Sequence, residues 1–188
     1  PIADAGLPQS ICRGTQATLT ATGGVSYLWS EGSTTPSITV SPYYSTTYQV
    51  TVTDGNGCQA VDSVRLVIKP NPNTSAGLDK TICLGGTATL TALGAPNYVW
   101  NPGNLVGNSI SVSPTQTTTY IVTGNGINGC SDSDSVTVFV NPLPAANAGP
   151  DQMICEGTTT SLTATGGVSY YWSTTGANVP TIYVNPLM

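Results

Sequence analysis

Apolar and polar residues alternate along short segments of this chain, and the alternation returns at regular intervals. In residues 17–21 alanine and leucine share one parity and threonine the other, and residues 37–40, 47–52 and 63–68 show the same period of two. Such alternation is typical of half-buried strands, here rich in β-branched residues and separated by Gly, Pro, Asn and Ser. No segment has a convincing 3.6-residue period. The pattern therefore predicts an all-β protein.

Residues of several types recur 71 or 72 residues apart, which indicates tandem copies of one domain. They are Cys12, Cys83 and Cys155; Trp29, Trp100 and Trp172; Ile38, Ile110 and Ile182; Tyr48 and Tyr120; and Cys58 and Cys130. A one-residue insertion lies between Trp100 and Ile110. About seven short strands in a unit of about 72 residues predict a small antiparallel sandwich of the immunoglobulin kind.

Two proline-containing segments, residues 69–72 and 141–144, occupy equivalent places in the repeat. They divide the chain into a first repeat at 1–70, a second at 71–142 and an incomplete third at 143–188, whose last two strands are absent. Proline stiffens the chain, so the junctions should be short and semi-rigid. Tandem sandwiches joined in this way predict an extended rod.

Composition narrows the range of functions. Only 7% of the 188 residues are charged, histidine is absent and the net charge is −5. Four basic residues cannot form a phosphate-binding patch, so nucleic acid is excluded as a partner. No apolar run approaches the roughly 18 residues of a membrane-spanning helix. Without histidine there is no His-based triad or His–metal site, and the carboxylates are scattered. We expect a non-enzymatic protein without a cofactor.

The five cysteines suggest stabilising cross-links. Each complete unit has one cysteine near its start and one in a Gly-Cys turn, so we expect disulfides within the repeats, Cys12–Cys58 and Cys83–Cys130, formed in an oxidising compartment. Free buried thiols are the alternative. Zinc is disfavoured because there is neither histidine nor a Cys-x-x-Cys pair. Cys155 should be unpaired, since its partner would lie near position 202.

The incomplete third repeat has two explanations. Either the chain is a segment of a longer array, or a neighbouring chain supplies the missing strands and so builds a filament. In the first case Cys155 should be reactive in a monomer. In the second it should be buried or bridged in a polymer.

A family resemblance covers essentially the whole chain. The segment Tyr27–Cys58, YLWSEGSTTPSITVSPYYSTTYQVTVTDGNGC, resembles a PKD-type or immunoglobulin-like repeat. The AGxDxxIC entry before TLTATG further resembles repeats of very large Bacteroidetes cell-surface and gliding adhesins. The resemblance implies export, often by a type IX route, and adhesion or stalk duty at the cell surface. Two features depart from the PKD pattern. Ser30, Asn101 and Ser173 stand where PKD repeats typically have acidic loop residues, and Gly126 stands in the second unit where the first has Asp54.

Two surface features are candidates for modification and contact. The Asp-Ser-Val triplets at 62–64 and 134–136 resemble the O-glycosylation acceptor of exported Bacteroidetes proteins, so Ser63 and Ser135 are candidate acceptors, or else merely begin the last strand. Strand parity points Val99, Ile121 and Phe139 outward on three neighbouring strands. We expect them to form an apolar contact face for a neighbouring chain or partner, unless a sugar, a loop or the adjoining repeat covers it.

Calcium and glycan binding are two further alternatives. Asp54 and Asn56 in a turn, with Asp79 and Asp151 near the junctions, are the candidate calcium ligands, but these acids do not cluster. The three tryptophans could stack on sugars, yet one per unit at a fixed register is typical of a sandwich core. The main hypothesis is thus a structural or adhesive stalk segment of a secreted or cell-surface protein. Its partners would be neighbouring repeats or chains, and surface glycans or proteins. A filament subunit and a glycan-binding module are the alternatives.

Overall fold

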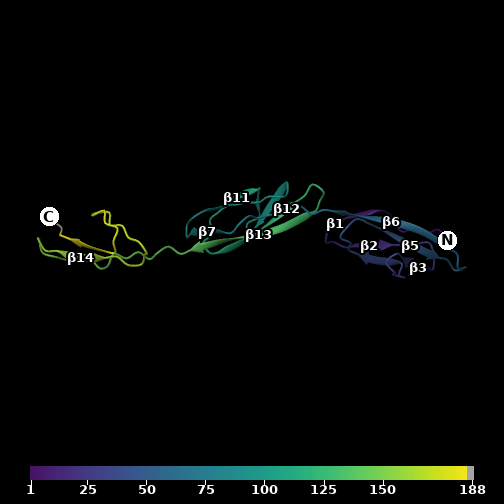
Figure 1. The fold of residues 1–188 in the computed structure, drawn as a ribbon, viewed down its shortest axis with the longest axis horizontal. Coiled ribbons are helices and arrows are strands. Elements are labelled where there is room, and N and C mark those ends of the chain that lie inside the picture. Colours follow the sequence, from purple (N-terminus) through teal and green to yellow (C-terminus); the bar gives the residue numbers. More distant parts are fainter. Residues whose placement is uncertain (186–188) are drawn as a thin grey trace.

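The computed structural model describes residues 1–185, and those residues form strands, turns and loops without any helix. Figure 1 shows three groups of strands, one after another along the longest axis from the N-terminus to the C-terminus. The first group holds β1 (Gln9–Cys12), β2 (Ala17–Thr20), β3 (Ser26–Trp29), β4 (Ser37–Val40), β5 (Thr46–Thr53) and β6 (Gln59–Lys69). The second holds β7 (Lys80–Cys83), β8 (Ala88–Thr91), β9 (Asn97–Asn101), β10 (Leu105–Val106), β11 (Ser109–Val112), β12 (Thr118–Asn125) and β13 (Ser131–Asn141). The third holds β14 (Thr160–Thr163) and β15 (Thr181–Val184).

The first repeat is a sandwich of two sheets. One sheet has the order β1-β6-β5-β3, and the other pairs β2 with β4. β5 lies antiparallel to both β3 and β6, whereas β1 runs parallel to β6. The inward residues of both sheets meet in one core, where Trp29 is 1% exposed and Val50 and Leu66 are fully buried. This strand order confirms the all-β, immunoglobulin-like fold predicted from the alternation.

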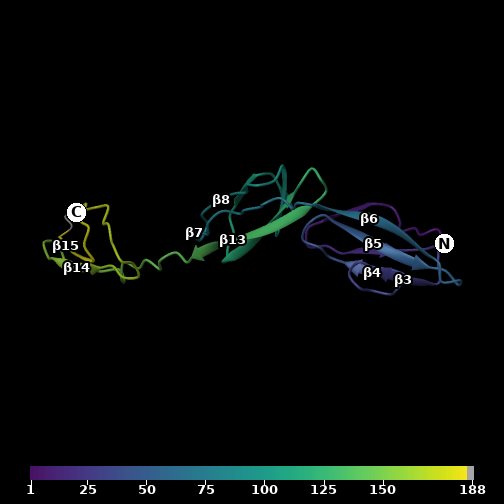
Figure 2. The same cartoon turned by 45° about the vertical axis from the view of Figure 1, so that its right-hand side comes forward.

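The second repeat is built in the same way around a separate core. Its larger sheet has the order β10-β9-β12-β13-β7, and β8 pairs with β11 to form the other sheet. Trp100 and Val122 are fully buried, and Tyr98 is buried beside them. The extra strand β10 lies where the sequence has its one-residue insertion. Figure 2 shows the long strands β6 and β13 running along the two repeats.

A carboxylate holds the entry segment of each complete repeat. Asp62 on β6 accepts a hydrogen bond of 2.8 Å from the backbone N–H of Ala5, and Asp134 on β13 accepts one of 2.8 Å from Ala76. Hydrogen bonds to the ionised form stabilise it. The bond from Ala5 therefore lowers the pKa of Asp62, and the bond from Ala76 lowers that of Asp134.

A close turn also shapes the entry to the second repeat. Gly94 has a φ of +97°, and a Cβ there would lie 1.8 Å from the backbone oxygen of Asn73. Gly23 has a φ of +104° and faces the oxygen of Ile2 in the same way in the first repeat. Only glycine fits such an approach.

The third repeat forms only part of the sandwich in the described residues. β14 and β15 pair antiparallel, as do the equivalent strands β2 and β4. Counterparts of β5 and β6 are absent from residues 143–185, and residues 152–155, which match β1, form no strand. The connection at residues 141–150 is exposed throughout. It appears in Figure 2 as a single segment between β13 and the third repeat.

Candidate functional site: the junction between the first two repeats

A disulfide joins the first repeat to the second, which corrects the pairing expected from the sequence. Cys12 at the end of β1 is bonded to Cys130, which precedes β13, with an S–S distance of 2.04 Å and a Cα–Cα distance of 5.5 Å. The expected bonds Cys12–Cys58 and Cys83–Cys130 are therefore wrong. Cys58 and Cys83 are free and exposed, and so is Cys155.

The topology explains why a bond within a repeat cannot form. β1 runs parallel to β6, so Cys12 lies opposite Lys69 at the last residue of β6, whereas Cys58 directly precedes Gln59 at its first residue. The 11 residues of β6 place the two cysteines about 35 Å apart at roughly 3.3 Å per residue. A disulfide needs Cα atoms within about 7 Å. The two cysteines of one repeat thus lie at opposite ends of their sandwich.

Three hydrogen bonds accompany the disulfide. Lys69 Nζ donates to the backbone oxygen of Asn128 at 2.9 Å, and Asn128 Nδ2 donates back to the oxygen of Pro70 at 2.8 Å. Asn71 Nδ2 donates to the oxygen of Arg13 at 3.2 Å. The first two bonds link the repeats to each other, and the third braces the linker against the first repeat. Sequence reasoning missed these three residues, although the Lys-Pro-Asn-Pro linker already placed two polar side chains at the junction.

The second repeat's side of the disulfide is buried, while Cys12 is half-buried. Cys130 is 1% exposed, although it lies in a turn at the end of a strand pair. Further along, Asp132 accepts a 3.2 Å hydrogen bond from the backbone N–H of Thr74, where the linker enters the second repeat. A disulfide that is buried on the Cys130 side and half-buried at Cys12, with hydrogen bonds beside it, fixes one arrangement of the two chain segments. The junction is therefore a covalent cross-link between the first and second repeats.

Two of the candidate calcium ligands, Asp54 and Asp79, accept hydrogen bonds from backbone N–H groups. Asp54 Oδ1 accepts hydrogen bonds from the N–H groups of Asn56 and Cys58 at 2.9 and 3.0 Å. The bond from Cys58 contributes most to lowering the pKa of Asp54, followed by the bond from Asn56. Asp79 accepts from the N–H of Thr137 at 2.8 Å. Among residues 1–185, no three His, Cys, Asp or Glu side chains come together as a metal-binding group.

The expected apolar contact face is only partly continuous. Val99 is half-buried, while Ile121 and Phe139 are 50% and 45% exposed, so all three reach solvent on adjacent strands. Val99 lies diagonally across from Ile121, because its direct partner is Thr123.

Phe139 does not join that row, which corrects the expected strip of three. The residue opposite Ile121 on β13 is Ser135, and Phe139 lies four residues, or roughly 13 Å, further along the strand. The exposed Val106 of β10 pairs with Val99 and extends the face on the other side. A role of this face in contact remains a prediction.

Each candidate acceptor serine directly follows, in the sequence, the aspartate that holds the entry segment of its repeat. Ser63 and Ser135 are both exposed, on β6 and β13 respectively. Ser63 lies opposite Gln49, and Ser135 lies opposite Ile121. The aspartate of each triplet thus has a structural partner whether or not the serine is modified. Glycosylation remains a prediction.

Two of the three tryptophans are core residues, which leaves no stacking surface for a sugar on them. The indole Nε1 of Trp29 donates to the oxygen of Thr35, and that of Trp100 to Gly107, each at 3.0 Å. Trp172 makes the equivalent bond to Val179 at 2.9 Å but remains half-exposed.

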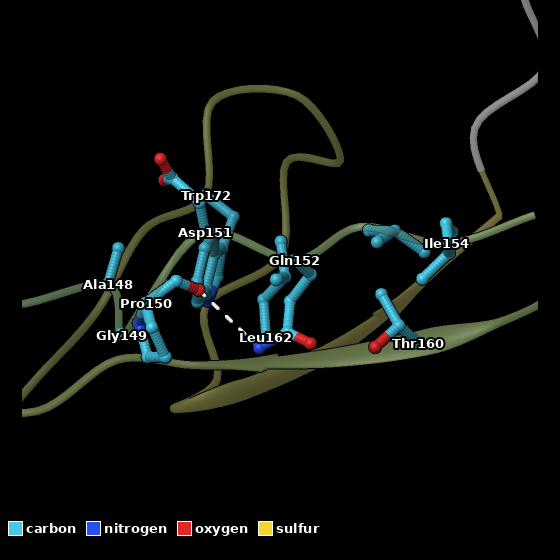
Figure 3. Close-up of a pocket in the computed structure, with 10 residues that line it drawn as sticks. Ala148, Gly149, Pro150, Asp151, Gln152, Ile154, Thr160, Leu162 and Trp172 are labelled. Carbon is cyan, nitrogen blue, oxygen red and sulfur yellow. Dashed lines mark hydrogen bonds between the residues drawn. The ribbon is translucent and has the colours of Figure 1, made fainter.

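The reason for this exposure is the open side of the third repeat. An open hollow of about 410 Å³ lies there, and Ile154, Leu162 and Trp172 are among the residues that line it. Figure 3 shows Trp172, Gln152 and Ile154 above the strand that carries Leu162 and Thr160. Leu19, the counterpart of Leu162 in the first repeat, is 1% exposed. The hollow therefore corresponds to the part of the core that the larger sheet covers in each complete repeat.

Comparison with known proteins finds neither a matching family model nor a matching curated protein. Solved structures of tandem immunoglobulin domains are similar at low identity. The N-terminal eight Ig domains of Down Syndrome Cell Adhesion Molecule are 15% identical, with 98% of this chain and 37% of that chain covered and a TM-score of 0.39. The insect immune protein hemolin is 16% identical, with 73% and 46% covered and a TM-score of 0.37. The Ig1-2 module of the Drosophila receptor protein tyrosine phosphatase DLAR is 16% identical, with 71% and 94% covered and a TM-score of 0.30.

The assignment of this chain as immunoglobulin-like rests on its own strand order and its two cores. Within residues 1–185, no helix has the length and apolar character needed to cross a membrane.

Proposed function

We propose that this chain is a structural or adhesive stalk segment of a large secreted or cell-surface repeat protein, of the kind built from PKD-like and immunoglobulin-like repeats in Bacteroidetes. The Cys12–Cys130 bond carries the proposal, because it fixes two consecutive sandwiches to each other. Disulfides persist in oxidising compartments, which supports an extracellular location. The function is to hold repeats in line and to present their outer faces, without catalysis.

The linker chemistry supports a fixed arrangement at the first junction. Lys69, Asn71 and Asn128 satisfy backbone oxygens there, so the two sandwiches meet through directional bonds as well as through the disulfide. The face formed by Val99, Val106 and Ile121 is the candidate adhesive surface of the second repeat. Apolar side chains gathered on a sheet face are suited to contact with another protein surface.

Small-angle X-ray scattering tests the stalk geometry. The oxidised chain should give one elongated shape, whereas the Cys12→Ala variant should give a broader range of dimensions, because the first junction then depends on hydrogen bonds alone. The Cys58→Ala variant is the matched control and should scatter like the unchanged chain. A compact oxidised particle, with the repeats folded against one another, would contradict the proposal.

Surface labelling tests the location. An antibody against the first repeat should label intact source cells without permeabilisation. Deletion of the gene segment should weaken attachment of those cells to a surface. Labelling that appears only after lysis would exclude a role outside the cell.

A filament subunit is the second candidate, and the open third repeat favours it. Trp172 and Leu162 line this hollow. The residues equivalent to them in the two complete repeats are buried. Strands from a neighbouring chain would cover this hollow by taking the places that β5 and β6 occupy in the first repeat.

Analytical ultracentrifugation together with acrylamide quenching of tryptophan fluorescence separates the two candidates. Assembly that increases with concentration and protects Trp172 from quenching supports the filament. A monomer whose Trp172 stays accessible at all concentrations excludes it. The Trp172→Phe variant identifies the contribution of this residue to the quenching.

A further inference from the structure

Each of the three free cysteines is in a position equivalent to one of the two that are bonded. Cys58 matches Cys130 in the repeat, whereas Cys83 and Cys155 match Cys12, and Cys58 and Cys83 lie in the two complete repeats. At the formed junction, a turn cysteine of the second repeat meets a strand-end cysteine of the first. Cys58 is a turn cysteine without a preceding repeat in the structure, and Cys83 is a strand-end cysteine that faces the following repeat.

The turn around Cys58 has the backbone geometry of the bonded turn. Gly57 and Gly129 both have a φ of +82°. The N–H of Gly57 donates to the oxygen of Asp54 at 3.1 Å, and the N–H of Gly129 donates to Gly126 at the same distance. The turn is therefore formed before any bond is made, and it does not depend on the partner repeat.

The strand end that carries Cys83 also matches its bonded counterpart. Cys83 lies opposite Asn141 on β13, as Cys12 lies opposite Lys69 on β6. The residue after each cysteine then donates its N–H to the residue opposite: Arg13 to Lys69 at 3.0 Å, and Leu84 to Asn141 at 2.8 Å. Cys58 and Cys83 thus lie on backbone segments with the geometry of the bonded pair.

Burial and hydrogen bonding show what a neighbouring repeat adds. Cys130 is 1% exposed, whereas its counterpart Cys58 is exposed. Asn128 donates to the oxygen of Pro70 across the formed junction. Its counterpart Asn56 is exposed, and Pro142 is the counterpart of Pro70. One member of this pair is therefore available at each further junction: Asn56 toward a preceding repeat and Pro142 toward a following one.

We infer that Cys58 and Cys83 are docking positions for further repeats of this same kind, each forming the disulfide seen between Cys12 and Cys130. The strand-end cysteine of one repeat would bond to the turn cysteine of the next, so that successive bonds overlap along the array. The inference goes beyond a stalk function, because it specifies the covalent partner of each thiol. It does not depend on what the array adheres to.

The bond forms by thiol–disulfide exchange with a disulfide oxidant. Two cysteine thiols lose two protons and two electrons and become one S–S bond. The oxidant, glutathione disulfide in the test below, takes up both electrons and both protons and becomes two thiols. The chain itself supplies only the two thiols and their placement.

A tandem protein tests the inference. Residues 1–143 are placed directly before Pro1 of the full chain, so that Pro1 takes the position of Pro144 and the register of the repeat is kept. Cys83 of the added copy and Cys58 of the full chain are then 118 residues apart, the same separation as Cys12 and Cys130. The protein is refolded with glutathione disulfide, alkylated and mapped by mass spectrometry without reduction.

The expected map has a Cys12–Cys130 bond in each copy and a third bond from Cys83 of the added copy to Cys58 of the full chain. Cys58 of the added copy, and Cys83 and Cys155 of the full chain, should be alkylated. The inference is overturned if the two junction thiols are alkylated while both Cys12–Cys130 bonds have formed. It is equally overturned if Cys12 or Cys130 pairs elsewhere.

Paired variants check that the position matters. Cys58→Ser in the full-chain part should leave Cys83 of the added copy alkylated and all other bonds unchanged. The same substitution in the added copy should change no bond. A new partner for Cys83 in the first variant would show non-specific oxidation and would also overturn the inference.

Discussion

The substitution Cys12→Ala should destabilise whichever of the two sandwiches unfolds first. Cys130 lies beside the linker, so when the first repeat unfolds alone the disulfide closes a loop of about 60 residues. In the chain-entropy description, such a loop contributes about 4 kcal/mol to the free energy of unfolding. When both repeats unfold, the bond closes a loop between residues separated by 118 positions, which contributes about 5 kcal/mol in total.

The bond therefore acts mainly on the first unfolding step. About 4 kcal/mol is lost from that step on substitution, and only about 1 kcal/mol from the second. For a domain of this size the first melting transition should fall by up to roughly 15–30 °C. Calorimetry of the unchanged chain and of Cys12→Ala measures both transitions. Reduction of the unchanged chain should reproduce the variant.

The free cysteines provide the controls. Cys58→Ala and Cys83→Ala remove exposed thiols and should change the free energy of unfolding by no more than about 0.5 kcal/mol. If Cys58→Ala were as destabilising as Cys12→Ala, the result would support a Cys12–Cys58 bond within the repeat. It would refute the Cys12–Cys130 bond between the repeats.

Three further outcomes can be measured by urea unfolding followed by circular dichroism. Trp100→Ala should lower the free energy of unfolding by about 3–5 kcal/mol because the indole is fully buried, whereas Trp172→Ala in the open third repeat should cost far less. Gly94→Ala should destabilise by about 1–3 kcal/mol, since the residue has a positive φ and faces a backbone oxygen; Gly55→Ala, with open space around it, is the control. The pKa of Asp134 is lowered by backbone N–H groups, so its stabilising effect is present above the usual carboxyl pKa of about 4 and is lost as the pH falls through the lower folded-state pKa. Asp134→Asn should therefore make stability less dependent on pH in that acidic range, and an unchanged acid transition would contradict this.

The fold could be predicted from the sequence because alternation and repetition are local and independent of partners. The inward positions of the alternating segments, such as Leu19 and Val50, are core residues, and Val40 and Ile68 are partly buried against that core. Parity also predicted correctly that Ile121 and Phe139 reach solvent. It could not place them side by side, because register depends on the pairing of strands that are distant in sequence.

The disulfide pairing could not be predicted in this way, because position within the repeat does not give position in space. Cys12 and Cys58 belong to one unit, yet the parallel pairing of β1 with β6 separates them by the length of a strand. An immunoglobulin-like order with the entry strand beside the last strand already implies this separation. The residues of the linker could have been identified for the same reason, since they meet the turn of the following repeat.

The disulfide also changes which part of the chain would bear tension when its ends are pulled apart. The shortest covalent route runs from the N-terminal residues to Cys12, across to Cys130 and out through β13. The 117 residues between the two cysteines lie outside that route. Even after both cores have come apart, roughly 400 Å of extended backbone could not be drawn out, at about 3.4 Å per residue. An oxidised array of this kind would yield only a small part of its contour length, and a reducing environment would release the rest.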